Sequence, residues 1–217
     1  MDSRFRGNDI RDKDKEGIMK EIFPGIWTWS WFCEEKGYPF NGLLLIEGDK
    51  AVLIDPPLMT EAARAALRRF PPIHAIYLTN KDHERAAHDL RREFKIPLWI
   101  HELDKPLLKE EPDHVFTEGR KLECGIRVVH LQHQKSPGES AFYLEKRKTL
   151  IVGDALIGHP AGKLNLLPTV KYRDFRKAHV GLRRLFILSF EAMLVGDGQS
   201  ILSGAQEALE QFFDELR

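Results

Sequence analysis

Residues 78–89, LTNKDHERAAHD, gather side chains that can bind a metal or transfer a proton. Asp82, His83, Glu84 and His88 fall within seven positions and follow an apolar run. Imidazole nitrogens and carboxylate oxygens are common ligands of zinc and other divalent metals in proteins. The stretch therefore indicates either a metal site or a site in which something has replaced the metal.

Three further aspartates stand where predicted strands end. Asp55 ends the run VLID, Asp154 lies in VGDAL, and Asp197 lies in LVGDG. Lys135 directly precedes the turn SPGE at 136–139. We expect these side chains to lie on loops that converge at one end of the folded chain.

Apolar patterning predicts the elements that must position these loops. Strands are predicted at 26–32, 73–79, 96–101, 125–132, 140–146, 149–156 and 192–197, and 42–56 is typical of a two-stranded hairpin. Helices are predicted at 58–70, 82–94, 173–188 and 204–217, with Thr60 and either Asn80 or Asp82 as N-caps. This order favours an α/β (α+β) fold of two packed sheets with helices outside.

Composition narrows the class of protein. The 217 residues carry 33 Lys plus Arg and 33 Asp plus Glu, so we expect neither a nucleic-acid nor a membrane partner. Residues 1–18 are polar and predict a disordered leader before one domain at 19–217, with Met19 as an alternative start. Cys33 and Cys124 are isolated, which fits a cytoplasmic protein.

The ordered motifs resemble those of the metallo-β-lactamase fold family, close to its glyoxalase II-like members, over most of residues 20–217. The landmarks are the strands ending at Asp55 and Thr79, SPGE in place of the family's G-H-[ST]-P-G, VGDAL, and LVGDG in place of P-G-H-G. The resemblance implies a four-layer αββα sandwich of two mixed sheets, and descent from hydrolases.

The zinc ligands that the resemblance would bring are almost all replaced. Aligning the family's T-H-x-H-x-D-H on Thr79 leaves only Asp154 with its expected identity. The other former ligand positions hold Asn80, Asp82, Glu84, Arg85, Lys135 and Asp197. A fixed cation about 4 Å from a divalent metal opposes binding by roughly 8 kcal/mol at an effective dielectric of about 20. We therefore expect the dinuclear zinc site to be lost, with no metal cofactor and no standard metallohydrolase activity.

A lysine could take over the role of the metal. Without a cation, a carboxylate cluster repels itself, and an ammonium group has three donors with which to bind it. We hypothesise that Lys135 stands where the metal stood, held by Asp154, Asp197 and either Asp82 or Asn80. The expected structural cluster comprises Asp55, Thr79, Asn80, Asp82, His83, Lys135, Asp154 and Asp197, with Asp55 supporting the loops.

Two alternatives stay open. One is an active hydrolase of small esters or thioesters with a single divalent metal, Zn, Mn or Fe, on Asp82, His83, Asp154 and Asp197. The other is a non-catalytic module that binds a small-molecule anion in the former pocket. Any catalytic residue is sought among Asp82, Lys135, Asp154 and Asp197. The simplest interpretation of His83 itself is a solvent-facing or capping residue at a helix start.

Overall fold

A computed structural model describes residues 18–215. The predicted disordered leader lies outside the described residues, except for Ile18. Within the described range, no helix is long and apolar enough to cross a membrane.

The larger sheet has seven strands in sequential order. Its first four strands are antiparallel and include the predicted 42–56 hairpin, which is confirmed, while β4 to β7 run parallel to one another. The strands are β1 (Lys20–Phe23), β2 (Ile26–Cys33), β3 (Tyr38–Glu47), β4 (Lys50–Ile54), β5 (Ile73–Tyr77), β6 (Leu98–His101) and β7 (His114–Phe116). Sequence patterning did not predict the edge strands β1 and β7, which are only four and three residues long.

The smaller sheet has four strands in the order β11, β10, β9, β8. It is also mixed, because β10 pairs parallel with β11 and antiparallel with β9. Its strands are β8 (Arg127–His130), β9 (Ser140–Leu144), β10 (Thr149–Val152) and β11 (Ala192–Val195).

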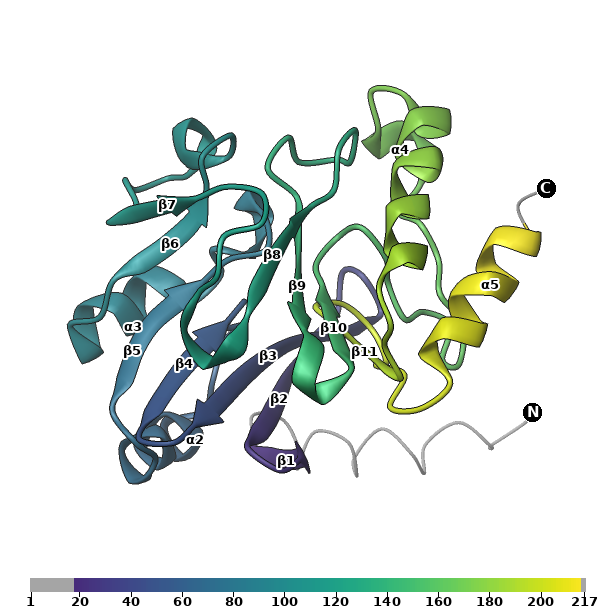
Figure 1. The fold of residues 1–217 in the computed structure, drawn as a ribbon. Coiled ribbons are helices and arrows are strands. Elements are labelled where there is room, and N and C mark those ends of the chain that lie inside the picture. The colour runs from purple at the N-terminus through teal and green to yellow at the C-terminus, as the bar shows by residue number, and fades with distance from the viewer. Residues whose placement is uncertain (1–17, 216–217) are drawn as a thin grey trace, which may run out of the picture.

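Helices cover the outer face of each sheet, which confirms the four-layer αββα architecture (Figure 1). The helices α2 (Glu61–Ala66) and α3 (Ala87–Phe94) pack their buried residues on the larger sheet. On the smaller sheet lie α4 (Phe175–Gly181), the 3-10 helix η7 (Leu182–Ile187) that continues it, and α5 (Ala205–Glu215). A third core between the sheets includes Leu43, Val52, Phe142 and Leu194.

The predicted helix at 82–94 is wrong over its first five residues. A short 3-10 turn, η2 (Lys81–His83), comes first, and α3 begins only at Ala87. Arg85 between them has a φ of 30°, a left-handed conformation that interrupts a right-handed helix. The side chains of residues 83–85 therefore point in other directions than they would in a continuous helix. The break thereby determines which of these side chains lie in the site.

Asn41 joins the two sheets beside the loop that carries Asp197. Its side-chain amide donates to Val195 O at 2.9 Å and to Gly198 O at 2.7 Å, and its Oδ1 accepts from Ser30 Oγ at 2.7 Å. Its backbone N–H donates to Gly196 O at 2.7 Å. The side chain is 8% exposed, so these carbonyls have little access to water as a replacement partner.

We predict that Asn41→Ala lowers the free energy of unfolding by about 2–3 kcal/mol, because it leaves two carbonyls without donors. Urea denaturation measures this value. Asn165→Ala is the matched control: the Asn165 side chain donates one exposed hydrogen bond, to His159 O, and its loss is expected to cost less than about 1 kcal/mol. Equal effects of the two substitutions would contradict a special role for Asn41.

Candidate functional site

Four strands end at the site. Asp55 follows β4, Thr79 follows β5, Asp154 follows β10 and Asp197 follows β11. The pairs β4–β5 and β10–β11 are parallel, so their carboxyl ends lie at the same edge of each sheet. The loops of the two sheets meet at this end, because His83 lies within 3.4 Å of both Asp55 and Asp154.

Asp55 holds both Thr79 and His83. Its Oδ1 accepts from Thr79 N at 2.8 Å, and its Oδ2 accepts from Thr79 Oγ1 at 2.6 Å. His83 Nδ1 lies 2.8 Å from the same Oδ2. All three residues are buried, so Asp55 is both a support for the loop and the fixed partner of an imidazole.

His83 lies at the centre of the site, and the expectation of a solvent-facing His83 is wrong. The residue is 1% exposed, and its Nε2 lies 3.4 Å from Asp154 Oδ1 and 3.9 Å from Asp197 Oδ1. These are ion-pair distances, but this nitrogen makes no hydrogen bond of normal geometry within the described structure. A Cβ at Gly196 would lie 2.5 Å from the ring, so only glycine fits there.

Lys135 contacts two of the carboxylates that the hypothesis named, Asp154 and Asp82, but not Asp197. Its Nζ lies 2.6 Å from Asp154 Oδ2 and 2.9 Å from Asp82 Oδ2. Asp197 instead pairs with Arg85, whose Nη2 lies 2.5 Å from Asp197 Oδ1. The correction follows from the break before α3, which turns the Arg85 side chain into the site, where its guanidinium stacks on Phe40 at 3.9 Å.

The pKa values of the central groups follow from burial and these partners. Burial and the Arg85 charge lower the pKa of His83, but Asp55 and Asp154 outweigh them and raise it to about 10. Burial would raise the pKa of Asp154, yet His83 and Lys135 hold it well below its ordinary value. These directions favour the protonated form of His83 and the ionised form of Asp154.

Two further carboxyl groups respond differently to burial. Burial raises the pKa of Asp197, and His83 and Arg85 offset this only in part. Burial, followed by the Asp154 charge, raises the pKa of Glu139 well above its usual range. Glu139 Oε1 accepts from Asn80 Nδ2 at 3.3 Å and from Ala155 N at 3.2 Å, while Oε2 has no partner in the described structure.

Asn80 and Glu84 make their hydrogen bonds with groups other than the possible metal ligands. Asn80 is fully buried, and its Oδ1 accepts from Asp82 N at 2.9 Å, which confirms it as an N-cap, here of η2. Glu84 pairs with His88 Nε2 at 2.8 Å and accepts from Lys109 N at 2.8 Å. Neither residue contributes to the set of possible metal ligands, which consists of His83, Asp154 and Asp197. Asp82 is also outside that set, contrary to the four-ligand alternative.

Sequence patterning missed Asp104, a buried residue that ties two site loops together. Its carboxylate accepts from Lys81 N at 3.0 Å, Ser136 Oγ at 2.5 Å and Gly138 N at 2.7 Å. A signal existed, because Asp104 follows β6 closely and β6 is parallel to β5. Strand-end position alone would have pointed to it, as it did for Asp55.

The donor set does not fit a dinuclear zinc centre. It contains one imidazole, and the three atoms that could bind an ion lie within 4.8 Å of one another. Lys135 and Arg85 already contact the two carboxylates, at 2.6 Å and 2.5 Å. Among the groups joined by ion pairs, four carboxylates (Asp55, Asp82, Asp154, Asp197) face four basic side chains (Lys81, His83, Arg85, Lys135).

The model of the metallo-beta-lactamase superfamily matches residues 19–216. An uncharacterised protein of Aquifex aeolicus (strain VF5) is 27% identical over 137 residues. That match spans 54% of this chain and 64% of the relative.

Solved structures share the fold at low identity. The metallo-beta-lactamase DIM-1 superposes with a TM-score of 0.70 at 15% identity, covering 90% of this chain and 98% of its own. A metallo-beta-lactamase family protein from Thermus thermophilus gives 0.68 at 19% identity, covering 90% and 80%. FIM-1 from Pseudomonas aeruginosa, in a mono-zinc form, gives 0.70 at 15%, covering 93% and 96%.

We predict that Lys135→Met lowers the free energy of unfolding by about 2–3 kcal/mol. The side chain is 23% exposed, so the loss is smaller than the roughly 3–5 kcal/mol typical of a fully buried pair. Reversible urea melts measure the change. Lys81→Met is the matched control, because Lys81 contacts only the partly exposed Asp82 and its loss should cost less than about 1 kcal/mol. An unchanged melt for Lys135→Met would refute the structural role of this lysine.

Stability should also depend on the charge of His83. Its folded pKa of about 10 exceeds the ordinary 6.5, so its contribution is complete below about pH 6.5 and is lost as pH rises toward 10. The limiting slope is about 1.4 kcal/mol per pH unit. We expect urea melts between pH 7 and pH 9.5 to show this decline in the parent protein and a much flatter profile in His83→Gln. Parallel profiles would mean that His83 is neutral in the folded protein.

Proposed function

Because the chain belongs to the metallo-beta-lactamase superfamily, we propose that it is a member in which buried ion pairs have replaced the metal centre. On this proposal it lacks standard metallohydrolase activity. The observation that carries the proposal is the contact of Lys135 and Arg85 with the two carboxylates, Asp154 and Asp197, that would otherwise face an ion. On this proposal, Lys135, His83 and Arg85 together supply the positive charge that a metal would supply to the carboxylates of the site.

The protonation of His83 gives a second argument. A metal ligand must be neutral imidazole, and removing a proton of pKa about 10 at pH 7 costs about 4 kcal/mol. A divalent ion at Asp154 and Asp197 would in addition be repelled by Lys135 and Arg85, because each of these cations contacts one of the two carboxylates. Both effects oppose metal binding at neutral pH.

The consequence for chemistry is the loss of the family's nucleophile. Zinc supplies hydrolases with a bound water of lowered pKa, and no side chain of this cluster replaces that water. Lys135, Arg85 and His83 are each held by carboxylates, and their positive charge makes them poor general bases. The site is therefore better suited to binding than to hydrolysis.

A small anion is the ligand that suits the open side of the cluster. Lys135 and Lys81 have side chains that are 23% and 27% exposed, and they flank Asp82. An ammonium group has three donors, of which Lys135 uses two and Lys81 uses one on carboxylates. The remaining donors point to a small carboxylate or phosphate as the bound molecule.

A second candidate function rests on the unpartnered Nε2 of His83. This atom, with one oxygen each from Asp154 and Asp197, could hold a single divalent ion, while Asp55 orients the ring through Nδ1. Such a centre would support hydrolysis of small esters or thioesters. It requires His83 to lose its proton and Arg85 to move away from Asp197.

Metal content separates the two candidates. We predict that tag-free protein purified without chelator holds less than about 0.1 equivalent of Zn, Mn or Fe by elemental mass spectrometry. Because the ion-paired carboxylates of the cluster already face basic side chains, EDTA should leave the melting temperature unchanged.

One equivalent of metal together with an EDTA-sensitive melt would contradict the proposal. The ligand assignment would then be checked with His83→Ala, which should remove the metal. His88→Ala is the matched control, because His88 is a buried histidine of the same segment that pairs with Glu84 away from the site.

A further inference from the structure

We propose that the outer face of α4 and η7 docks on an anionic lipid surface. This face consists of the exposed side chains Arg173, Arg176, Lys177, Val180, Arg183 and Ile187, and we call it the α4 face. The inference stands on these residues and does not rest on the proposed function of the ion-pair cluster.

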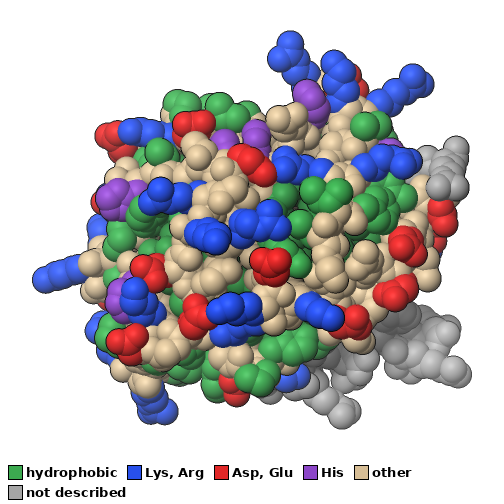
Figure 2. Space-filling model, viewed as in Figure 1, with side chains coloured by type: hydrophobic (Ala, Val, Ile, Leu, Met, Phe, Trp, Pro, Cys, Tyr) green, Lys and Arg blue, Asp and Glu red, His purple; other side chains and the backbone are tan. Residues whose placement is uncertain are grey.

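The charge of the chain is distributed unevenly, although its total is zero. Residues 169–188 carry six lysines and arginines and one acidic residue, Asp174, whereas the whole chain has 33 of each sign. The space-filling view shows basic side chains projecting at the end of the molecule where α4 lies (Figure 2). The whole-chain balance led us to expect no membrane partner, and the local excess leads to a different proposal.

The basic groups of the α4 face are largely free to meet a partner. Among the described residues, no ion pair joins Arg173, Arg176 or Arg183 to a carboxylate, and Lys177 is 3.8 Å from Asp174, which caps α4. Arg183 lies over the Phe213 ring at 5.2 Å. Arg184, by contrast, is committed to Glu118, so it is not counted in the face.

Aliphatic side chains alternate with these arginines. Val180 is 60% exposed and Ile187 is 80% exposed, and nearby Val170 is 85% exposed. Arg176 and Val180 lie four residues apart in α4 and therefore share one face of that helix, and the exposed Arg183 and Ile187 follow in the 3-10 helix η7. Large aliphatic residues exposed to this degree in a basic surface indicate a partner that is both anionic and apolar.

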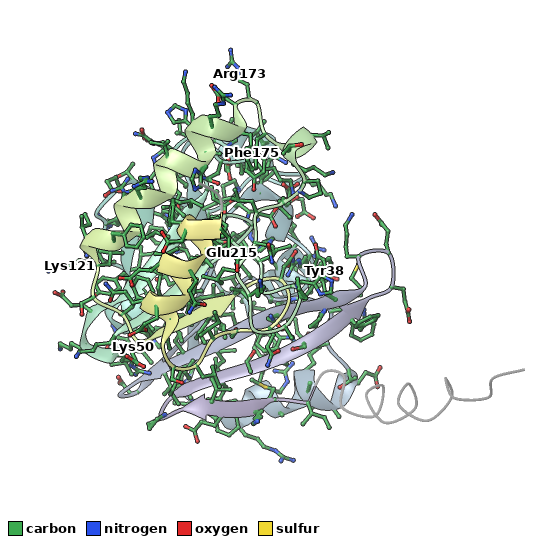
Figure 3. The ribbon with its side chains drawn as sticks, turned by 90° about the vertical axis from the view of Figure 1, so that its right-hand side faces the viewer. Tyr38, Lys50, Lys121, Arg173, Phe175 and Glu215 are labelled. Carbon is green, nitrogen blue, oxygen red and sulfur yellow. The ribbon has the colours of Figure 1, made fainter. Side chains whose placement is uncertain are left out.

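The opposite side of the segment fixes it to the protein. Ala178, Leu182 and Leu185 are fully buried, the latter two in the core beneath the smaller sheet. Arg173 lies at one extremity of the molecule, where a flat surface can reach it (Figure 3). The segment can therefore lie on a surface without leaving the fold.

Lipid fits this combination better than nucleic acid. An anionic bilayer presents headgroup phosphates and carboxylates to the arginines, with acyl chains a few ångströms deeper for Val180 and Ile187. A nucleic-acid backbone would leave both aliphatic side chains against charged phosphates. We therefore commit to an anionic lipid surface as the partner.

Vesicle flotation with the full chain tests the proposal. Vesicles of phosphatidylcholine and phosphatidylserine at about 70:30 should carry the protein, and pure phosphatidylcholine should not. Arg176→Gln/Arg183→Gln is expected to lower the partition coefficient at least about tenfold, and Val180→Ser/Ile187→Ser at least about fivefold. All substituted side chains are exposed, and unchanged melting curves would verify that the variants fold.

Matched controls use exposed residues outside the α4 face. Lys121→Gln/Lys146→Gln removes two charges and Leu58→Ser/Leu103→Ser removes two aliphatic side chains, and both should partition like the parent protein. Three results would overturn the proposal: no binding to anionic vesicles, binding indifferent to Val180→Ser/Ile187→Ser, or retention on duplex DNA without binding to vesicles.

Discussion

The structure of the site depends on one buried cation, the imidazolium of His83, placed between Asp55 and Asp154. Both carboxylates are buried, so each needs polar partners within the protein, and the ring lies within 3.4 Å of both. Asp55 in turn fixes the end of β5 through Thr79, and Asp154 receives Lys135 on its other oxygen. The loops of both sheets are thereby joined through a single ring, in the manner in which a metal joins its ligands.

Close packing makes this arrangement possible. Gly196 leaves room for the His83 ring, and a Cβ at Gly153 would lie 2.2 Å from Thr79 Oγ1. Asp55 and Arg85 have φ values of 47° and 30°, which cost of order 1–3 kcal/mol each for a residue other than glycine. Both residues keep this conformation while their side chains hold His83 and Asp197, so the ionic contacts and the backbone shape support each other.

A closed set of ion pairs has different consequences from a metal centre. Buried pairs contribute little net stability compared with apolar packing, but removal of one member leaves an uncompensated charge. Such a cluster specifies the geometry of the loops more than it stabilises the fold. The charged groups of the cluster pair with one another, whereas the α4 face has an excess of basic side chains at the surface.

The sequence by itself determined the fold class and the strand ends that carry Asp55, Thr79, Asp154 and Asp197. Those features follow from local hydrophobic periodicity and from residue identity. Only the tertiary structure decided that His83 is buried, that Arg85 rather than Lys135 pairs with Asp197, and that Asp104 and Glu139 belong to the site. The physical reason is that these contacts depend on the break between η2 and α3 and on side chains from distant loops meeting within hydrogen-bond distance, which local periodicity does not encode.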